Sequence, residues 1–428
     1  MIELADRVRG LLGPRAVGEL EWRGRKDPLA LALPASVDEM QVLLRWARAE
    51  HVSVVPVGAG SKLGWSRPPG PRGGDVLALS TRRLQRIVEY EPGEGVITAL
   101  AGTRMATLRD AAREHGHWLT PDVPAAENAT LGGVIAAGQS GRDRLRHGPV
   151  RHHVLGVRAL MADATLAKSG GRLVKNVTGF DLPRLFTGSH GALCVIVEAT
   201  LRLAVAPRVE AVVTASARDG AELAARARAV VRSRARPISL HAARLDPPTE
   251  AAQFALFAHL GGHDEVVRDE IALLRELWEP AAVFEGAEAV ELARGQREID
   301  FLVEPRPWLH ATTSPESLPA VLGALDRATA FLPTRTLVEP ALASVDVQLR
   351  MPDGEKLDAA RWIELVPALR RELAALGGSL TVRNPTRKLA DSGVPWPPIE
   401  HGGALMRALR DRLDPDSVFA RGRFEEDL

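Results

Sequence analysis

The sequence predicts an α+β protein with at least two domains, and three observations support this prediction. The chain has 428 residues, which is more than one ordinary hydrophobic core holds. Hydrophobic residues make up 45% of it and charged residues 25%, as in most globular proteins. Short β-branched runs alternate with segments of helical periodicity, and the pattern of these segments changes after Pro207.

The first 207 residues combine short strands with glycine-rich turns. Predicted helices cover 37–50 and 104–115, and Asp181 can cap a short third helix with Pro183 in its first turn. A proline-containing loop covers 120–128. The predicted strands are 52–57, 76–79, 86–90, 96–101, 154–161, 173–177 and 193–203, with a turn at 169–171.

After Pro207 the alternation predicts a second α+β domain, over residues 208–380, with helices on one face of a sheet. A C-terminal segment, 381–428, follows and is expected to return to the first domain. The predicted strands are 209–216, 238–243, 254–260, 308–312 and 345–349, and the predicted helices are 221–232, 265–277, 318–328, 362–376 and 403–413.

Charge and cysteine content exclude several classes of function. The net charge is +1, so nothing indicates binding to nucleic acid or to an anionic membrane surface. The single cysteine, Cys194, excludes an internal disulfide and an iron–sulfur cluster held by this chain alone. The charged first residues do not resemble a signal peptide, and no apolar run reaches the roughly 20 residues of a membrane span. A cytoplasmic location, with membrane association only through partner subunits, is expected.

Two glycine-rich segments could bind a large ligand. Gly58-Ala59-Gly60-Ser61-Lys62 follows a strand, and successive backbone N–H groups in such a turn can form an anion-binding concavity. Leu63 replaces the last glycine of the dinucleotide-binding fingerprint, and the lysine spacing does not fit a P-loop. The second segment, 130–141, is rich in glycine and alanine, which let a flat ligand or a packed helix approach the backbone. A plain turn and close helix packing are the alternatives, but two such segments favour one shared ligand.

The order of these motifs resembles the FAD-binding domain of the vanillyl-alcohol oxidase/p-cresol methylhydroxylase (PCMH-type) superfamily. The resemblance rests on segments 56–63, 88–92, 101–103 and 129–133. The runs 175–185 and 414–423 are similar to segments of the FAD-binding subunit of bacterial glycolate oxidase. The resemblance implies a PCMH-type FAD-binding domain of two α/β subdomains over 1–207 and a cap or substrate domain with an antiparallel sheet over 208–380.

The resemblance also implies which residues border the cofactor. Val57, Gly58, Ala59, Gly60, Ser61 and Lys62 would form the pyrophosphate loop, and Thr130, Leu131, Gly132 and Gly133 would lie along the ribityl chain, the pyrophosphate or the ring. Ser140, Gly141 and Arg144 would also border FAD, and Ile196 would meet it through its backbone. Covalent flavin links in the superfamily use His, Cys or Tyr. The first loop offers only Ser61 and Lys62, so non-covalent FAD is expected.

Some residues depart from the family pattern. Phe180 stands where the group has Tyr, and Cys194 stands where it has Gly; we expect the thiol to pack inward. The metal-binding His-x-Gly-Asp-Gly-Asn-x-His motif of larger relatives does not occur in the sequence. His259 and His263 have a helical metal-pair spacing, but Gly261 and Gly262 interrupt it. No metal site is therefore expected.

Oxidation of a 2-hydroxy acid needs a cation for the carboxylate and a base for the hydroxyl proton. Candidate cations are Arg350, Arg383, Arg387 and Arg423, and His310 is the candidate base. A solvated surface role for each arginine and a structural role for His310 are the alternatives, and the sequence assigns catalysis to none of them.

The resemblance implies an FAD-binding oxidoreductase subunit that acts on a small 2-hydroxy acid such as glycolate. The resemblance implies that it would work beside a larger flavoprotein subunit and an iron–sulfur subunit. The cluster ligands must then come from another chain, because one cysteine cannot supply them. One alternative is a stand-alone flavin oxidoreductase for another alcohol or acid. The other is a structural subunit that has lost FAD, although the two glycine-rich segments are intact.

Overall fold

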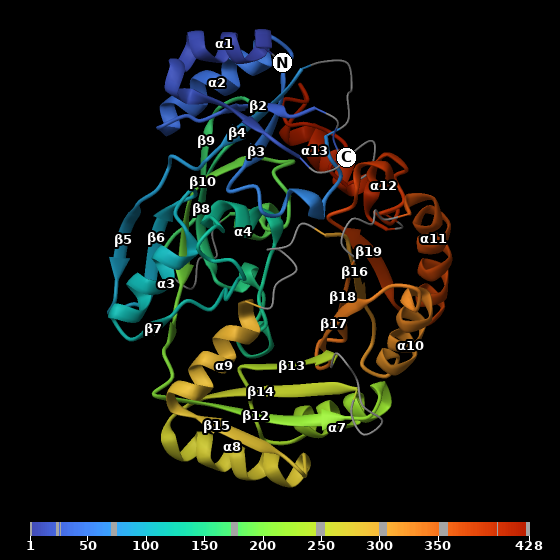
Figure 1. Cartoon of the computed structure of the whole chain (residues 1–428). Coiled ribbons are helices and arrows are strands. Elements are labelled where there is room, and N and C mark those ends of the chain that lie inside the picture. The colour runs from blue at the N-terminus through green and yellow to red at the C-terminus, as the bar shows by residue number, and fades with distance from the viewer. Residues whose placement is uncertain are drawn as a thin grey trace. The chain divides into compact units, whose positions relative to one another are not determined.

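The computed structural model describes residues 2–22, 25, 27–69, 75–172, 179–244, 253–298, 306–350, 358–399 and 401–424. The chain divides into two compact units (Figure 1). Unit 1 comprises Met1–Ser140, Pro149–Val205 and Pro398–Leu428, and unit 2 comprises Gly141–Gly148 and Ala206–Pro397. Residues 381–397 are thus grouped with unit 2. The assignment of functions to residues 1–207, 208–380 and 381–428 stays a prediction.

The described helices and strands of unit 1 alternate along the chain. They are α1 (Ile2–Leu12), β1 (Val17–Leu20), β2 (Leu29–Ala32), α2 (Val37–Ala49), β3 (Ser53–Val57), β4 (Val76–Ser80), β5 (Ile87–Glu91), β6 (Val96–Leu100), α3 (Met105–Glu114), β7 (His117–Trp118), α4 (Leu131–Ala137), β8 (Val154–Leu160), β9 (Leu166–Gly170), α6 (Leu182–Phe186), β10 (Val195–Arg202), β11 (Ala204–Val205) and α13 (Gly403–Leu413).

The first sheet of unit 1 has the order β1-β2-β4-β3, in which β4 runs parallel to both of its neighbours. Helix α2 begins at its cap Ser36, whose side chain accepts a hydrogen bond from the backbone N–H of Glu39. The apolar stripe of this helix is buried against the sheet, as helical periodicity requires. It consists of Met40, Leu43, Leu44 and Ala47.

The second sheet of unit 1 is antiparallel, with the order β5-β6-β10-β8-β9, and α3 and α4 pack in its core. The expected turn at 169–171 is wrong: β9 runs through Ser169 to Gly170 and pairs with β8. The reversal lies earlier, where the N–H of Met161 donates to the carbonyl of Thr165. A Cβ added at Gly170 would lie 2.1 Å from the carbonyl oxygen of Leu155, so this glycine permits close pairing with β8. The predicted strand 173–177 lies outside the described residues.

Unit 2 is built on one sheet with the order β15-β12-β14-β13-β17-β18-β16-β19, all of whose pairings are antiparallel. Its described elements are α5 (Arg144–His147), β12 (Val209–Ala217), α7 (Gly220–Arg232), β13 (Ser239–Arg244), β14 (Phe254–Gly262), α8 (Asp264–Leu277), β15 (Ala282–Glu285), α9 (Gly286–Glu298), β16 (Trp308–Thr312), α10 (Leu318–Thr329), β17 (Thr334–Glu339), β18 (Ser344–Leu349), α11 (Ala359–Ala375), β19 (Ser379–Arg383) and α12 (Arg387–Asp391).

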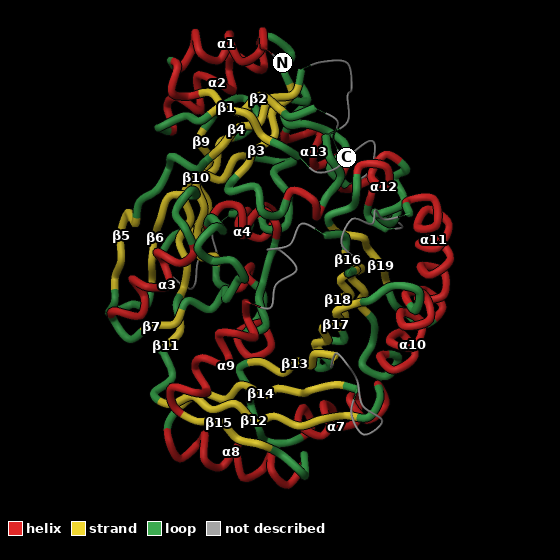
Figure 2. The backbone as a smooth tube through the Cα atoms, viewed as in Figure 1, coloured by secondary structure: helices red, strands yellow, loops and turns green. Residues whose placement is uncertain are grey.

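The two faces of this sheet differ in chemistry. Helices α7, α8, α10 and α11 bury their apolar stripes with alternate strand residues such as Val213 and Val345 in one core (Figure 2). Helix α9 instead packs with Val212 and Phe257, whose side chains point the other way. Where this second face is not covered by α9, it carries polar and titratable side chains. The α+β fold class and the antiparallel sheet are confirmed.

The C-terminal segment completes the core of unit 1. Residues 418–420 pair with Val54 of β3, and Phe419 is fully buried in the core that α1 and α2 share. The carboxylate of Asp414 is also fully buried and accepts hydrogen bonds from the N–H groups of Val418 and Phe419, each at 2.8 Å. This carboxylate therefore fixes the turn that directs the tail into the sheet.

Within the described ranges, no helix has both the length and the apolar character needed to cross a membrane. Within the same ranges, no three His, Cys, Asp or Glu side chains are grouped so that they could hold a metal ion. His259 lies in a strand, and His263 precedes α8, so the helical metal-pair geometry considered above does not form.

We expect Asp414→Ala to lower the free energy of unfolding by about 2 kcal/mol, because two buried N–H groups lose their acceptor. The shift of the urea midpoint, followed by circular dichroism, measures this loss. Asp411→Ala is the matched control, since this exposed carboxylate pairs with Arg421 at 3.2 Å and should contribute less than about 1 kcal/mol. Equal shifts for the two variants would contradict the assigned role of Asp414.

Candidate functional site

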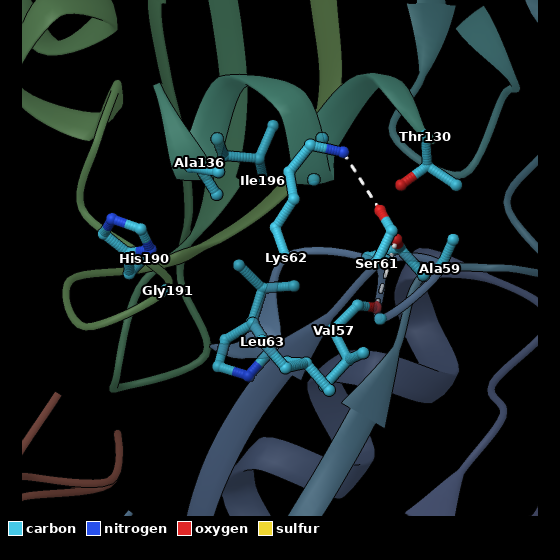
Figure 3. A pocket seen from close by; sticks show the side chains of 18 of the residues that line it. Val57, Ala59, Ser61, Lys62, Leu63, Thr130, Ala136, His190, Gly191 and Ile196 are labelled. Carbon is cyan, nitrogen blue, oxygen red and sulfur yellow. Dashed lines mark hydrogen bonds between the residues drawn. The ribbon is translucent and has the colours of Figure 1, made fainter. Parts of the chain in front are cut away.

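A pocket of unit 1 opens where β3 ends. The space between its lining atoms, including open solvent, is about 640 Å³. Its walls come from the loop 58–62, the first turns of α4, the loop before β10 and the C-terminal segment (Figure 3). Ligands commonly bind at the carboxyl ends of parallel strands, and β3 and β4 are parallel.

The residues that follow β4 hold the loop 58–62 in place. The N–H of Thr81, which follows β4, donates to the carbonyl of Val57, and the guanidinium of Arg82 donates to the carbonyl of Ala59 at 2.5 Å. Gly60 has φ +83°, a backbone conformation that other residues rarely adopt. The sequence therefore specifies a fixed turn here rather than a variable connection.

The two glycine-rich segments meet at this pocket. A Cβ added at Gly58 would lie 2.1 Å from Oγ1 of Thr130 and 3.4 Å from Cα of Gly133. At Gly132, an added Cβ would lie 2.7 Å from Cβ of Ala101, on the sheet side of α4. Gly132 therefore permits close packing of the helix on the sheet, whereas Gly58 and Gly133 let two backbones approach at the pocket wall.

The pocket has a positive lining. Lys62 and Arg423 are both buried there, and the described lining residues include no aspartate or glutamate. In Figure 3 the Lys62 side chain extends from the loop toward α4, and its Nζ lies 3.0 Å from Oγ of Ser61. Two cations without a lining carboxylate favour an anionic ligand.

Arg423 is oriented by aromatic and backbone contacts. Its guanidinium lies 4.4 Å from the ring centroid of Trp22 and donates to the carbonyl of Arg67 at 2.6 Å. Burial lowers the pKa of Arg423 to about 9, because the charged form has lost water. An anion bound in the pocket would offset that cost.

Most of the predicted cofactor-bordering residues line this one pocket. They are Val57, Gly58, Ala59, Gly60, Ser61, Lys62, Thr130, Gly132, Gly133 and Ile196. Leu131 is buried in the core beneath α4, and Oγ of Ser140 accepts a hydrogen bond from the N–H of Val150 at 2.9 Å. Gly141 and Arg144 belong to unit 2, where Arg144 pairs with Glu339 of β17.

Other lining residues were not among the predicted cofactor-bordering residues. Pro56, Leu63, Thr81, Ala136, His190 and Gly191 also line the pocket. Gly191 has φ +77°, and an added Cβ would lie 3.2 Å from the ring of Pro56. Arg423, proposed from the sequence as a cation for a substrate carboxylate, lines this pocket instead. Arg423 stands at the end of the run 414–423, and its place in that run was the sequence feature that singled it out.

The two departures from the family pattern have different environments. Phe180 is 89% exposed. Cys194 is buried in the core of the second sheet and also lines the pocket, and burial raises the pKa of its thiol. The thiol therefore packs inward, as expected, and stays protonated.

Two candidate catalytic residues of unit 2, His310 and Arg383, lie on strands of its sheet. Nδ1 of His310 lies 2.6 Å from Oδ1 of Asp346 on the neighbouring strand. Burial lowers the pKa of Arg383 to about 10, and Asp346 opposes that shift. Arg387, by contrast, is exposed beside Asp391, which fits a solvated role.

Comparisons with known proteins agree with this geometry. Residues 28–170 match the family described as FAD binding domain. A D-2-hydroxyglutarate dehydrogenase of Xanthomonas citri pv. viticola is 36% identical over 47% of this chain and 44% of its own length. The glycolate oxidase subunit GlcE of Escherichia coli is 37% identical over 38% of this chain and 45% of its own length. Each match thus spans less than half of the relative.

The fold extends further than the sequence similarity. A solved alkyldihydroxyacetonephosphate synthase superposes on 92% of this chain and 77% of its own, with a TM-score of 0.72 and 15% identity. At that identity the likeness concerns the fold alone.

The pocket fits FAD on its own features. Two buried cations suit a diphosphate, and Gly58 and Gly133 let the backbones of the two glycine-rich segments approach at the pocket wall. The orphaned hydroxyl of Thr130, which has no hydrogen-bond partner, is a further polar group available to a ligand. Residues 28–170 of this chain therefore form an FAD-binding domain, and FAD is its cofactor.

Proposed function

We propose that this chain is an FAD-dependent oxidoreductase that oxidises a small 2-hydroxy acid. The observation that carries the proposal is the cationic pocket of unit 1, which combines both glycine-rich segments within the FAD-binding domain. Two relatives, named for 2-hydroxyglutarate and for glycolate, point to 2-hydroxy acids as the substrate class. The two names differ in substrate, so glycolate is one candidate within that class.

In this proposal, the loop from Val57 to Lys62 holds the pyrophosphate of FAD through its backbone N–H groups. Lys62 and Arg423 oppose the phosphate charges, and Thr130–Gly133 and the backbone of Ile196 border the rest of the cofactor. FAD held there would supply the hydride acceptor that oxidation of the substrate carbon requires. The protein's part is to hold the cofactor and to exclude water from its buried side.

We propose that FAD is held non-covalently. Ser61 and Lys62 of the loop form no flavin link, and burial keeps the thiol of Cys194 protonated and therefore weakly nucleophilic. His190 also lines the pocket, and its ring packs edge-on against Phe424 at 5.5 Å. Release of all flavin into the supernatant on acid precipitation would support this assignment; flavin retained on the protein would overturn it.

A second candidate function is that of one subunit in a hydroxy acid oxidase complex. The similarity to GlcE supports it. The single cysteine means that any iron–sulfur cluster needed for onward electron transfer must lie on another chain. The structural alternative without FAD is disfavoured, because the pocket keeps both its space and its cations.

We expect Lys62→Met to weaken FAD binding about tenfold or more, since a charge-assisted contact to phosphate is lost while the side-chain length is kept. The FAD dissociation constant, measured by fluorescence titration of the apoprotein, gives the effect. Lys168→Met makes the same change at an exposed position of β9 and should leave the constant unchanged. Equal FAD affinity in the Lys62 and Lys168 variants would contradict the placement of the phosphates.

We expect a 2-hydroxy acid to bleach the flavin absorbance of the purified, FAD-loaded protein in the absence of oxygen. Glycolate and 2-hydroxyglutarate are the first substrates to test, with acetate and glutarate as controls that lack the hydroxyl group. Bleaching by neither acid, in protein that retains FAD and folds normally, would contradict the proposed activity for these substrates.

We expect the protein, isolated under mild conditions from its native cells, to co-purify with a second flavoprotein and an iron-containing chain. Iron and flavin analysis of the isolated species, with size-exclusion chromatography, checks this outcome. Elution at monomer size, combined with turnover of a hydroxy acid by the chain alone, would instead favour a stand-alone enzyme.

A further inference from the structure

Two residues outside the matched FAD-binding domain meet beside its cofactor pocket. The match covers 28–170, whereas Trp22 precedes this range and Arg423 lies beyond it. The Arg423 guanidinium lies 4.4 Å from the ring centroid of Trp22. Both residues are 4% exposed, and Arg423 lines the pocket. A contact between the two ends of the sequence therefore borders the cofactor site.

Among the described residues, Arg423 contacts neutral groups rather than a carboxylate. Its Nη1 donates to the carbonyl of Arg67 at 2.6 Å, and its Nε is buried without a hydrogen-bond partner. Burial lowers the pKa of Arg423 to about 9, since the charged form has lost water. The face of the Trp22 ring attracts this cation, and such attraction is stronger where water is excluded. The ring therefore stabilises a charge that the rest of its surroundings leaves uncompensated.

The position of Trp22 is itself fixed by packing. Its ring belongs to an apolar core that also contains Leu29, Val57 and Ala420. Val57 leads into the glycine-rich loop, and the N–H of Ala420 donates to the carbonyl of Val54 at 2.9 Å. The core thus joins the base of the loop to the C-terminal segment, and Trp22 is held between them.

The backbone and the head group of Arg423 are held by different contacts. The N–H of Arg67 donates to the carbonyl of Arg423 at 3.0 Å, which fixes the main chain. Arg67 follows the short helical turn Leu63–Trp65, which comes directly after Lys62. The segment that carries one pocket cation therefore anchors the backbone of the other. The direction of the guanidinium depends in addition on the Trp22 ring.

We propose that Trp22 is a positioning residue for FAD, whose ring holds the guanidinium of Arg423 toward the phosphates. A carboxylate in its place would pair with the arginine and compete with phosphate, whereas an aromatic face leaves the N–H donors available. The inference rests on the proposed function, which places the phosphates beside Arg423. It goes beyond that function because Trp22 is not among the lining residues of the pocket and acts through Arg423.

Fluorescence titration of the apoprotein with FAD tests this assignment. We expect Trp22→Leu to weaken FAD binding about fivefold or more, because Arg423 loses its aromatic partner. Trp22→Phe keeps an aromatic face and should restore most of the affinity, since the indole N–H of Trp22 has no hydrogen-bond partner to lose. Trp46→Leu is the matched control. Its ring lies 5.0 Å from the guanidinium of Arg7 and does not line the pocket, so the FAD affinity should not change.

The variant Arg423→Met separates positioning from general packing. It should weaken FAD binding about tenfold, because a charge-assisted contact is lost. Adding Trp22→Leu to it should then change the dissociation constant by less than about twofold, since no guanidinium remains to be positioned. An equally large loss in both backgrounds would mean that Trp22 acts through packing alone and would overturn the proposal. Wild-type affinity in folded Trp22→Leu would overturn it as well.

Arginine side-chain ¹⁵N spectra of the wild-type protein provide a test that needs no folded Leu variant. The Nε–H signal of Arg423, assigned by its loss in Arg423→Lys, should show the ring-current displacement of a guanidinium above an indole. It should move again when FAD is added. A signal without this displacement, or one that FAD leaves unmoved, would contradict the role of Trp22.

The outcomes also distinguish this proposal from the proposed function. FAD binding that depends on Arg423 but not on Trp22 would retain the placement of the phosphates and reject the role of Trp22. Full FAD affinity in Arg423→Met would reject both. Affinity that depends on Trp22, in a protein whose flavin no 2-hydroxy acid bleaches, would retain the role of Trp22 and reject the activity.

Discussion

The close approach of Gly58 to Thr130 and Gly133 is the constraint on which the cofactor site depends. It joins the end of a parallel strand in the first sheet of unit 1 to a helix that packs on the second sheet. A side chain at position 58 would separate the two segments, and the pocket would lose one of its walls. Gly132, on the opposite side of the same helix, sets the depth to which that helix sits on the sheet.

The charges of the site follow from this geometry. Lys62 is carried by the fixed loop, and Arg423 reaches the same pocket from the other end of the sequence. Both cations are buried, so their attraction to an anion is less weakened by water than at the surface. A cofactor with two phosphates suits such a site better than a neutral ligand does.

The sequence predicted those elements whose signal is local. The cap at Asp181 was identified correctly, because its side chain accepts a hydrogen bond from the N–H of Arg184 and its identity alone indicates that contact. The glycine-rich loop was located by its glycines and by the strand before it. The helices with apolar stripes, such as α8, were found by their periodicity.

Elements whose pattern depends on distant neighbours were missed. Strand β17 has few consecutive apolar residues and is defined by its pairing with β13 and β18. Helix α9 has a narrow apolar stripe, since it covers only part of a polar sheet face. Nδ1 of His241 in β13, which is buried and has no hydrogen-bond partner, likewise lies among strands and a helix far apart in the sequence, so no local motif indicates it.

The return of the C-terminal segment has a consequence for how the protein is made. Phe419 completes a core of unit 1, and residues 418–420 pair with the edge strand β3. The named strands of this unit all lie before residue 206. On the ribosome, unit 1 cannot acquire its full core until all of unit 2 has been synthesised and the tail has emerged. During translation the edge of β3 therefore stays unpaired until residues 418–420 have emerged, and in this interval that edge is exposed to pairing with other chains.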